Sequence, residues 1–180
     1  TVVASYNDSS LAYSIKLAAG EENDVIPVED MIASAAAAET VQSNDKVENV
    51  IDGNVGTMWH TPWNGNLAAE DKYLTIELKN DYKVSGYIYT PRSDAGSGAL
   101  NGIITKYEIY TSDDNINWQK VSEGDWAKDA SVKTAAFEPV QAKYVKLLAV
   151  ESHGGYVSAA EVRLKGERVY SDTEAPSAPA

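Results

Sequence analysis

The stretch "YLTIEL", residues 73–78, alternates polar and apolar side chains and so predicts a half-buried β-strand. A period of two places Leu74, Ile76 and Leu78 on one face and leaves the other face to solvent. The same alternation recurs in three later segments, "KYEIYTS" (106–112), "KYVKLLAV" (143–150) and "AEVRLKG" (160–166). Several short strands with one apolar face are typical of a two-sheet β-sandwich.

Turn-forming residues separate the predicted strands. They occur in four short segments, "KND" (79–81), "SDDN" (112–115), "EGD" (123–125) and "SHGG" (152–155). The alanine run "ASAAAA" (33–38) conflicts with an all-β chain, because alanine has the highest intrinsic helix propensity. We interpret the run as a small-residue strand or a loop.

The amino-acid composition of the chain limits the classes of binding partner that it is expected to have. The 180-residue chain carries 27 acidic and 15 basic side chains, for a formal net charge of −12. Such a surface repels phosphate and anionic lipid, which disfavours nucleic acid and acidic membranes. The absence of cysteine excludes disulfides, thiolate catalysis and zinc held by sulfur. No apolar run approaches the ~20 residues of a membrane-spanning helix, so we expect a soluble piece of a longer chain.

The two ends of the chain differ in composition from its centre. The acidic segment "GEENDVIPVED" (20–30) precedes the strand pattern, and the small, polar "SDTEAPSAPA" (171–180) follows it. Segments of the second kind behave as extended linkers. We therefore expect an N-terminal extension or the end of a preceding module over residues 1–27. The compact unit is expected over 28–169, followed by a proline-rich linker over 170–180.

A second stretch, "TMWHTPWNG" (57–65), gathers one of two histidines and two of four tryptophans. It fits a tryptophan-centred core with an uninvolved histidine. It equally fits a site for a flat polar ligand, held by ring stacking and a hydrogen bond to imidazole. The stretch alone leaves both interpretations open, although Trp59, Trp118 and Trp126 are expected to be core residues.

Five blocks of sequence occur in the order found in one known family. They are "NVIDGNVGTMWHT" (49–61), "VSGYIYTPRSD" (84–94), "NGIITKYEIYTSDDNINWQKV" (101–121), "KTAAFEPVQAKYVKLLAVES" (133–152) and "SAAEVRL" (158–164). In these blocks the chain resembles the family 32 carbohydrate-binding modules, relatives of the discoidin and coagulation-factor C-type domains. The resemblance covers roughly residues 30–166.

The resemblance implies a jelly-roll-like, galactose-binding-domain-like β-sandwich without catalytic activity. Such a module would recognise terminal galactose, N-acetylgalactosamine (GalNAc) or N-acetylglucosamine (GlcNAc) of host glycans, such as those of mucins, and tether a parent glycoside hydrolase to them. It implies an extracellular, secreted or bacterial cell-surface location. We expect a monomer within a multimodular chain, with neither nucleic-acid binding nor membrane insertion.

The resemblance also implies the ligand-binding residues. The polar members would read sugar hydroxyls, the aromatic members would stack on the C–H face of the sugar, and one carboxylate matches more loosely. The polar members are His60, Arg92 and Asn101, the aromatic members are Trp63 and Tyr156, and the loosely matching carboxylate is Glu39. The loop "RSDAGSGALN" (92–101) is longer than the family pattern, and its Asp94 is a further polar candidate.

A structural calcium site is implied as well. Its side-chain ligands would be Asp52, Thr57 and Glu161, and backbone carbonyls of Asn49, Asn54 and Ala160 would complete the shell. Hard oxygen ligands of this kind suit calcium, which would pin loops rather than take part in chemistry.

Two rival functions remain from the sequence. A glycoside hydrolase needs a pair of carboxylates ~5–9 Å apart, and such a pair can be drawn in any chain this acidic. A discoidin-like adhesion domain that binds protein or lipid is the second rival. Its lipid-binding form is disfavoured by the net charge of −12.

Overall fold

The computed structural model describes residues 24–36, 45–63, 67–92, 94 and 100–170. In this part of the chain, strands are joined by loops and short 3₁₀ helices. In chain order the elements are η1 (Val28–Asp30), β1 (Met31–Ala35), η3 (Val47–Ile51), β2 (Trp59–His60), η4 (Ala69–Asp71), β3 (Tyr73–Thr90), β4 (Ile104–Ser112), β5 (Gln119–Asp125), β6 (Lys133–Ser152), η6 (His153–Gly155), β7 (Ser158–Ala159) and β8 (Glu161–Arg168).

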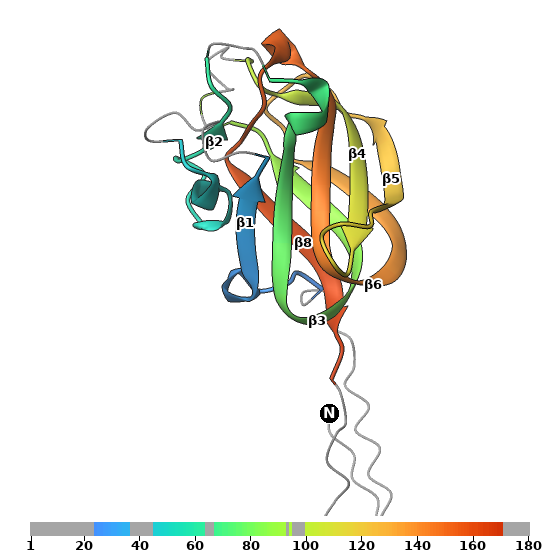
Figure 1. Ribbon diagram of the computed structural model, residues 1–180. Helices are drawn as coiled ribbons and strands as arrows, with labels where there is room; N and C mark the ends of the chain where they lie inside the picture. The colour runs from blue at the N-terminus through green and yellow to red at the C-terminus, as the bar shows by residue number, and fades with distance from the viewer. Residues whose placement is uncertain (1–23, 37–44, 64–66, 93, 95–99, 171–180) are drawn as a thin grey trace, which may run out of the picture.

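Two long strands, β3 and β6, run through both layers of an antiparallel sandwich. The front sheet has the order β1-β3-β6-β4-β5, and it uses the first half of β3 and the second half of β6. In the back layer, β8 pairs with the second half of β3, which pairs in turn with the first half of β6. Figure 1 shows the front sheet facing the viewer and β8 behind it. The predicted all-β sandwich is therefore confirmed.

The segment 79–81, predicted as a turn, is instead the place where β3 changes layer. The strand continues through it, but its pairing with β6 shifts register between Glu77 and Tyr82. Turn-forming residues interrupt a regular ladder, and here the interruption bends the strand instead of ending it. One long strand thus replaces two short strands joined by a hairpin.

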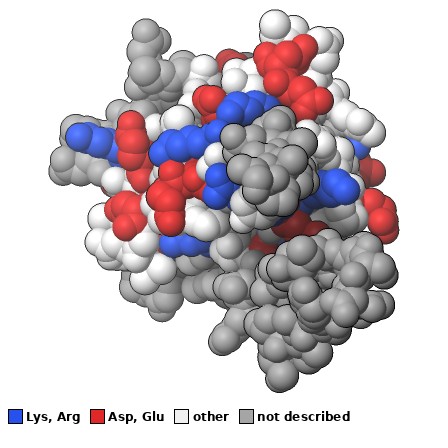
Figure 2. Space-filling view, turned by 90° about the horizontal axis from the view of Figure 1, so that it is seen from below, with Lys and Arg blue, Asp and Glu red and all other residues white. Residues whose placement is uncertain are grey.

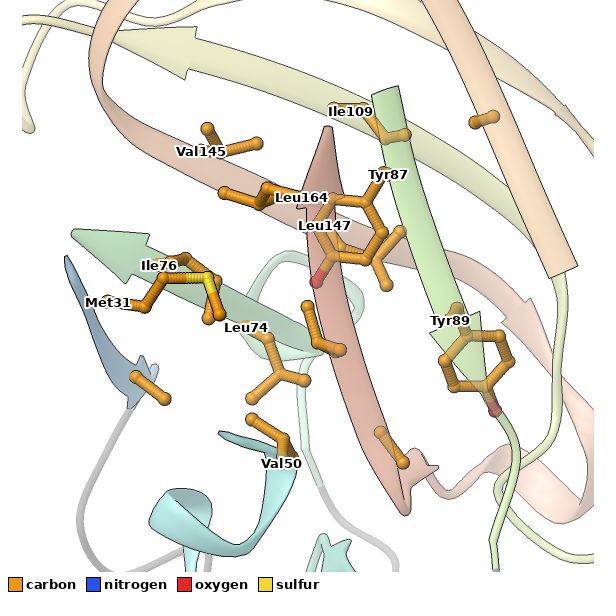
Figure 3. Packing of buried hydrophobic residues seen from close by; sticks show 14 of the residues in the cluster. Met31, Val50, Leu74, Ile76, Tyr87, Tyr89, Ile109, Val145, Leu147 and Leu164 are labelled. Atoms are coloured by element: carbon orange, nitrogen blue, oxygen red, sulfur yellow. The ribbon is translucent and has the colours of Figure 1, made fainter. Parts of the chain in front are cut away.

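The core lies between the layers and uses the predicted apolar faces. Leu74, Ile76 and Leu78 are at most 1% exposed and pack with Leu147 and Leu164 from β6 and β8 (Figure 3). Burying a side chain of this size stabilises the fold by about 1.5–3 kcal/mol. The alternation in the sequence thus identifies the inward face of the sheet correctly.

The N-terminal boundary of the packed unit lies before residue 28. Ile26 is 1% exposed, and its N–H donates to the carbonyl of Leu164 at 2.8 Å. The structure therefore packs part of the predicted extension onto β8. The alanine run supplies Ala33 and Ala35 to β1, in keeping with a small-residue strand.

The loops that carry the predicted ligand-binding residues lie at one pole of the sandwich, and the ends of the described chain lie at the other. At the upper pole in Figure 1, β2 pairs with β7 in a two-stranded sheet. At the lower pole, Gly166 donates to the carbonyl of Asp24, and Val169 to that of Asp81. Seen from that pole, acidic and basic side chains are interspersed (Figure 2). Within the described residues, no helix has the length and apolar character needed to cross a membrane.

Candidate functional site

The small β2–β7 sheet fixes the loops of the upper pole to one another. His60 pairs with Ser158, and the next residue, Thr61, exchanges two hydrogen bonds with Val157 at 2.8 and 2.9 Å. The hydroxyl of Tyr89, at the end of β3, donates to the carbonyl of Ser158 at 2.8 Å. Trp59 is buried beneath this sheet as a core residue, as the sequence predicted. The loops therefore rest on a rigid base.

His60 is buried and held in one tautomer. Its Nδ1 lies 2.5 Å from the carbonyl oxygen of Thr61, which can only accept, so Nδ1 carries the proton. Burial lowers the pKa of His60 below its usual 6.5, and the nearby guanidinium of Arg92 adds to the effect. The neutral ring then offers Nε2 as an acceptor. This nitrogen is buried and has no hydrogen-bond partner among the described residues.

Two aromatic rings cover the imidazole. The ring of Trp63 stacks on His60 with centroids 4.0 Å apart, and the ring of Tyr156 lies 5.6 Å from His60. Trp63 and Tyr156 are 5.2 Å apart, and the hydroxyl of Tyr156 donates to the Trp63 carbonyl at 3.2 Å. Trp63 is 44% exposed whereas His60 is fully buried, so the indole separates the imidazole from solvent.

Arg92 lies beside the rings and has two N–H donors to spare. Its Nε and Nη2 bind the carboxylate of Asp94, with Nη2 at 2.9 Å, and its Nη1 donates to the carbonyl of Asn101 at 2.8 Å. Its Cζ lies 5.7 Å from the centroid of Trp63. A guanidinium has five N–H groups, so one remains on each Nη for a ligand. The hydrogen bonds from Arg92 are the main reason that the pKa of Asp94 is lowered.

Asn101 is positioned by glycines that permit close approach. Gly102 has φ +87° and joins its own loop to the loop that follows β6. Its N–H donates to the backbone carbonyl of His153, and its carbonyl accepts from the backbone N–H of Ser158. At Gly154, with φ +71°, a Cβ would lie 2.7 Å from Oδ1 of Asn101. A larger residue at Gly154 would displace this amide, whereas one at Gly102 would clash with Ser158.

The structure thus brings together five of the six predicted ligand-binding residues, while Glu39 lies outside the described residues. The sequence pattern did not assign the roles of Gly102, Gly154 and Ser158. The "NG" pair at 101–102 and the "GG" pair at 154–155 signal turns, but they do not reveal that these turns meet.

The residues of the predicted calcium site also converge. One carboxylate oxygen of Asp52 accepts from the Thr57 hydroxyl at 2.7 Å, and the other accepts from the Asn54 N–H at 2.7 Å. The carbonyl oxygen of Asn54 lies 2.7 Å from the same Thr57 hydroxyl. Asn49 braces the loop through its side-chain amide, which donates to the Met58 carbonyl at 2.8 Å. The loop therefore gathers several oxygens around Asp52 and Thr57.

Glu161 brings a buried carboxylate next to this loop. It follows Ala160, which is buried and donates to the Thr90 carbonyl at 2.9 Å. Oε2 of Glu161 pairs with Arg163, whereas Oε1 is buried without a hydrogen-bond partner among the described residues. Burial raises the pKa of Glu161, and the neighbouring carboxylate of Asp52 adds to the effect. An orphaned carboxylate oxygen beside a second carboxylate suits a cation.

Within the described residues, no group of three or more His, Cys, Asp or Glu side chains is placed to hold a metal ion. The predicted calcium set contains only two carboxylates and relies on a hydroxyl and on carbonyl oxygens. Calcium accepts all of these oxygen types as ligands. The residues therefore fit calcium better than a metal that prefers nitrogen or sulfur ligands.

Comparison with known proteins places this arrangement in a family. Residues 34–162 match the F5/8 type C domain. A curated relative, an A type blood N-acetyl-alpha-D-galactosamine deacetylase of Flavonifractor plautii, is 36% identical over 144 residues. The match covers 78% of this chain but only 18% of that protein, so this chain spans about a fifth of the length of the relative.

Solved structures of carbohydrate-binding modules are similar to this chain in both fold and sequence. The family 32 carbohydrate-binding module from Clostridium perfringens NanJ, in complex with galactose, is 38% identical with a TM-score of 0.67. It matches over 78% of this chain and 97% of that chain. A second C. perfringens module, CpGH89CBM32-5 in complex with GalNAc-β-1,3-galactose, is 36% identical with a TM-score of 0.66 and matches over 78% and 99% of the two chains.

Proposed function

Because the chain belongs to the F5/8 type C family, we propose that it is a non-catalytic carbohydrate-binding module whose sugar site is the cluster around His60. The observation that carries the proposal is the buried Nε2 of His60, which has no hydrogen-bond partner among the described residues. It lies beneath Trp63 and beside the two N–H groups of Arg92 that those residues leave unused. Modules of this kind in solved structures are complexed with galactose and with GalNAc-β-1,3-galactose.

The cluster has the chemistry to read adjacent sugar hydroxyls. Each spare N–H of Arg92 donates to a hydroxyl oxygen, and Nε2 of His60 accepts a hydroxyl hydrogen. A hydroxyl that accepts from Arg92 still has its own hydrogen to give, so one hydroxyl satisfies both residues. Trp63 and Tyr156 supply apolar ring surface for the C–H face of the sugar. This set selects terminal galactose, GalNAc or GlcNAc, with Asn101 bonding a further hydroxyl.

Glycan binding requires Trp63 to leave the imidazole. The stacked pair, with centroids 4.0 Å apart, leaves no room for a sugar between the rings. The indole then moves from the imidazole onto the sugar face, which exchanges one stacking contact for another. A change in tryptophan fluorescence should therefore accompany binding.

The proposal is tested with a glycan array, followed by titration of the best galactose- or hexosamine-terminated ligand by calorimetry. Arg92→Ala should abolish binding because it removes both spare donors. Arg92→Lys should retain little binding, because an ammonium cannot present two parallel donors. Thermal unfolding controls for loss of fold. Unchanged affinity in folded Arg92→Ala would place the sugar site elsewhere.

We further propose that Asp52, Thr57 and Glu161 hold a structural calcium, together with carbonyls of Asn49, Asn54 and Ala160. Support comes from the buried orphan Oε1 of Glu161 and its contact with Asp52. Bound calcium neutralises the two carboxylates and joins the loop after η3 to the start of β8. Arg163, which pairs with Oε2 of Glu161, keeps the other half of that carboxylate oriented.

In its parent chain, the module tethers a glycoside-acting enzyme to host glycans outside the cell, as a secreted or cell-surface protein. Support comes from the curated relatives, of which the matched segment is only a part. The two ends of the described chain lie at the pole away from β2, which carries His60.

A further inference from the structure

The outer face of the front sheet carries aromatic side chains where an antiparallel sandwich usually presents polar ones. Three rings surround one ammonium group. Nζ of Lys146, on β6, lies 4.1 Å from the ring centroid of Trp118 and 5.2 Å from those of Tyr73 and Tyr110. This face points toward the viewer in Figure 1. Trp118 therefore covers the outside of the sheet and is not the core residue that the sequence predicted.

Strand pairing keeps this group together. Thr75, Lys146 and Tyr110 lie in one row across β3, β6 and β4. Thr75 points outward and is nonetheless buried under its neighbours, while Lys146 and the three rings remain partly exposed. We call Tyr73, Tyr110, Trp118 and Lys146 the aromatic face. It lies on the broad side of the sandwich, whereas His60 lies at its upper pole.

The ammonium of Lys146 has no carboxylate within 4.0 Å among the described residues, although carboxylates lie nearby. Glu108 is occupied, since one oxygen accepts from the Tyr110 hydroxyl and the other lies 3.2 Å from Lys120. Glu77 lies 4.0 Å from Lys143. Burial lowers the pKa of Lys146, and its charge is balanced only by π-faces. The aromatic face thus presents a cation that still lacks an anion.

We propose that the aromatic face is a second binding surface for an acidic saccharide, whose ring stacks on Trp118 or Tyr73 while its carboxylate or sulfate pairs with Lys146. Tyrosine and tryptophan rings favour the C–H face of a sugar, and the local cation selects those sugars that carry an anion. A protein partner would have to cover a wider area than these four side chains offer. The inference goes beyond the proposed function, because it uses none of the residues around His60.

The surface is tested on the whole chain, in a wild-type and in an Arg92→Ala background, so that the site at the upper pole is silent in one arm. The probes are sialyllactose, a galacturonic acid trisaccharide and galactose 6-sulfate, with lactose as the neutral control. Backbone amide shifts in NMR titrations locate the binding. We expect the acidic probes, but not lactose, to shift residues of β3, β4 and β6 in the Arg92→Ala protein. The three acidic probes distinguish a carboxylate from a sulfate as the preferred anion.

Lys146→Met keeps the aliphatic stem between the rings and removes the charge. We expect it to weaken binding of the best acidic probe by about two- to fivefold, the scale of a partly exposed ion pair. Lys146→Arg should restore binding. Lys143→Met is the matched control, because it removes a neighbouring lysine of β6 that already lies near Glu77. Thermal unfolding confirms that each variant is folded.

Two results would overturn the inference. One is equal affinity of acidic probes for wild type and folded Lys146→Met. The other is an absence of shifts on the front sheet in the Arg92→Ala background. Neither result affects the proposed function, which depends on galactose or hexosamine binding at His60. Conversely, loss of that binding leaves the test of the aromatic face intact.

Discussion

The imidazole of His60 gives the proposed sugar site a predictable response to pH. Because burial lowers its pKa, the ring stays neutral at pH values where an exposed histidine is already partly charged. We expect sugar affinity to be constant from pH 8 to about pH 6.5 and to fall only below the lowered pKa. There the ring gains a proton on Nε2, and the hydroxyl hydrogen loses its acceptor. Calorimetry across this range, with buffer corrections, measures the effect.

The lowered pKa of His60 also makes the stability of the folded protein depend on pH. The unfolded chain binds the histidine proton near pH 6.5, and the folded protein does so only at lower pH. The contribution of His60 to the stability of the folded protein is therefore complete above pH 6.5, and it is lost as the pH falls through the lowered folded pKa.

His60→Gln keeps an acceptor but does not titrate, so the sugar affinity of this variant should not change over this interval. A wild-type affinity that declines steadily from pH 8 would contradict the lowered pKa of His60.

Residue types around His60 could be predicted from the motif, but their contacts could not. The stretch 57–65 identifies a histidine between two tryptophans, and only one of these, Trp59, is in the core. That Tyr156 meets His60 and Trp63 depends on the pairing of β2 with β7, almost one hundred residues apart. The pairing of Arg92 with Asp94 depends likewise on a loop conformation for which short patterns carry no rule.

The loop after η3 and the start of β8 form one calcium-dependent unit in our proposal. In the absence of calcium, the raised pKa of Glu161 reports the cost of ionising a buried carboxyl, to which the neighbouring Asp52 adds. The stability that protonated Glu161 contributes to the folded protein is present at low pH. It is lost as the pH rises from about 4.5 through the raised pKa of Glu161. Calcium should therefore stabilise the protein most at neutral pH, by about 2.7 kcal/mol at one hundred times its Kd, or roughly 5–10 °C in Tm.

Differential scanning calorimetry with calcium and with chelator measures this response at pH 7 and pH 5. Asp52→Ala and Glu161→Gln should unfold at the same temperature in both solutions. Asp113→Ala, an exposed carboxylate of the β4–β5 turn, should respond like the wild type. A response to calcium that persists in Asp52→Ala would remove this loop from the site.

The strands themselves were largely predictable, but their arrangement was not. Apolar alternation in 73–78, 106–112, 143–150 and 160–166 marks segments that lie in β3, β4, β6 and β8. Alternation reports which side of a strand is buried, not which strand lies beside it. The bend at 79–81 and the shared use of β3 and β6 follow from long-range packing. The same limit explains Trp118, which directly precedes β5 and is placed by the pairing of β5 with β4.

The proposed sugar site around His60 lies at the pole remote from the two ends of the described part of the chain. A terminal hexose has ~12 non-hydrogen atoms, and ~0.3–0.4 kcal/mol per atom gives ~4–5 kcal/mol, or about millimolar affinity. Retention on a glycan surface must then come from several sites acting together. Joining modules end to end raises the effective concentration of the second site to about the millimolar range or above.

Two copies of the chain joined in tandem should therefore bind a galactose-terminated glycoprotein surface at least about tenfold more tightly than one copy. The gain needs both sites, because a single-site ligand such as lactose should bind each copy with unchanged affinity. The matched control carries Arg92→Ala in one copy, which keeps the size and charge pattern of the tandem protein nearly unchanged. Surface plasmon resonance on immobilised glycoprotein compares the three proteins. Equal retention of the control and the intact tandem would show that the gain comes from surface outside the His60 cluster. The aromatic face would then be the first region to test, with Lys146→Met in both copies.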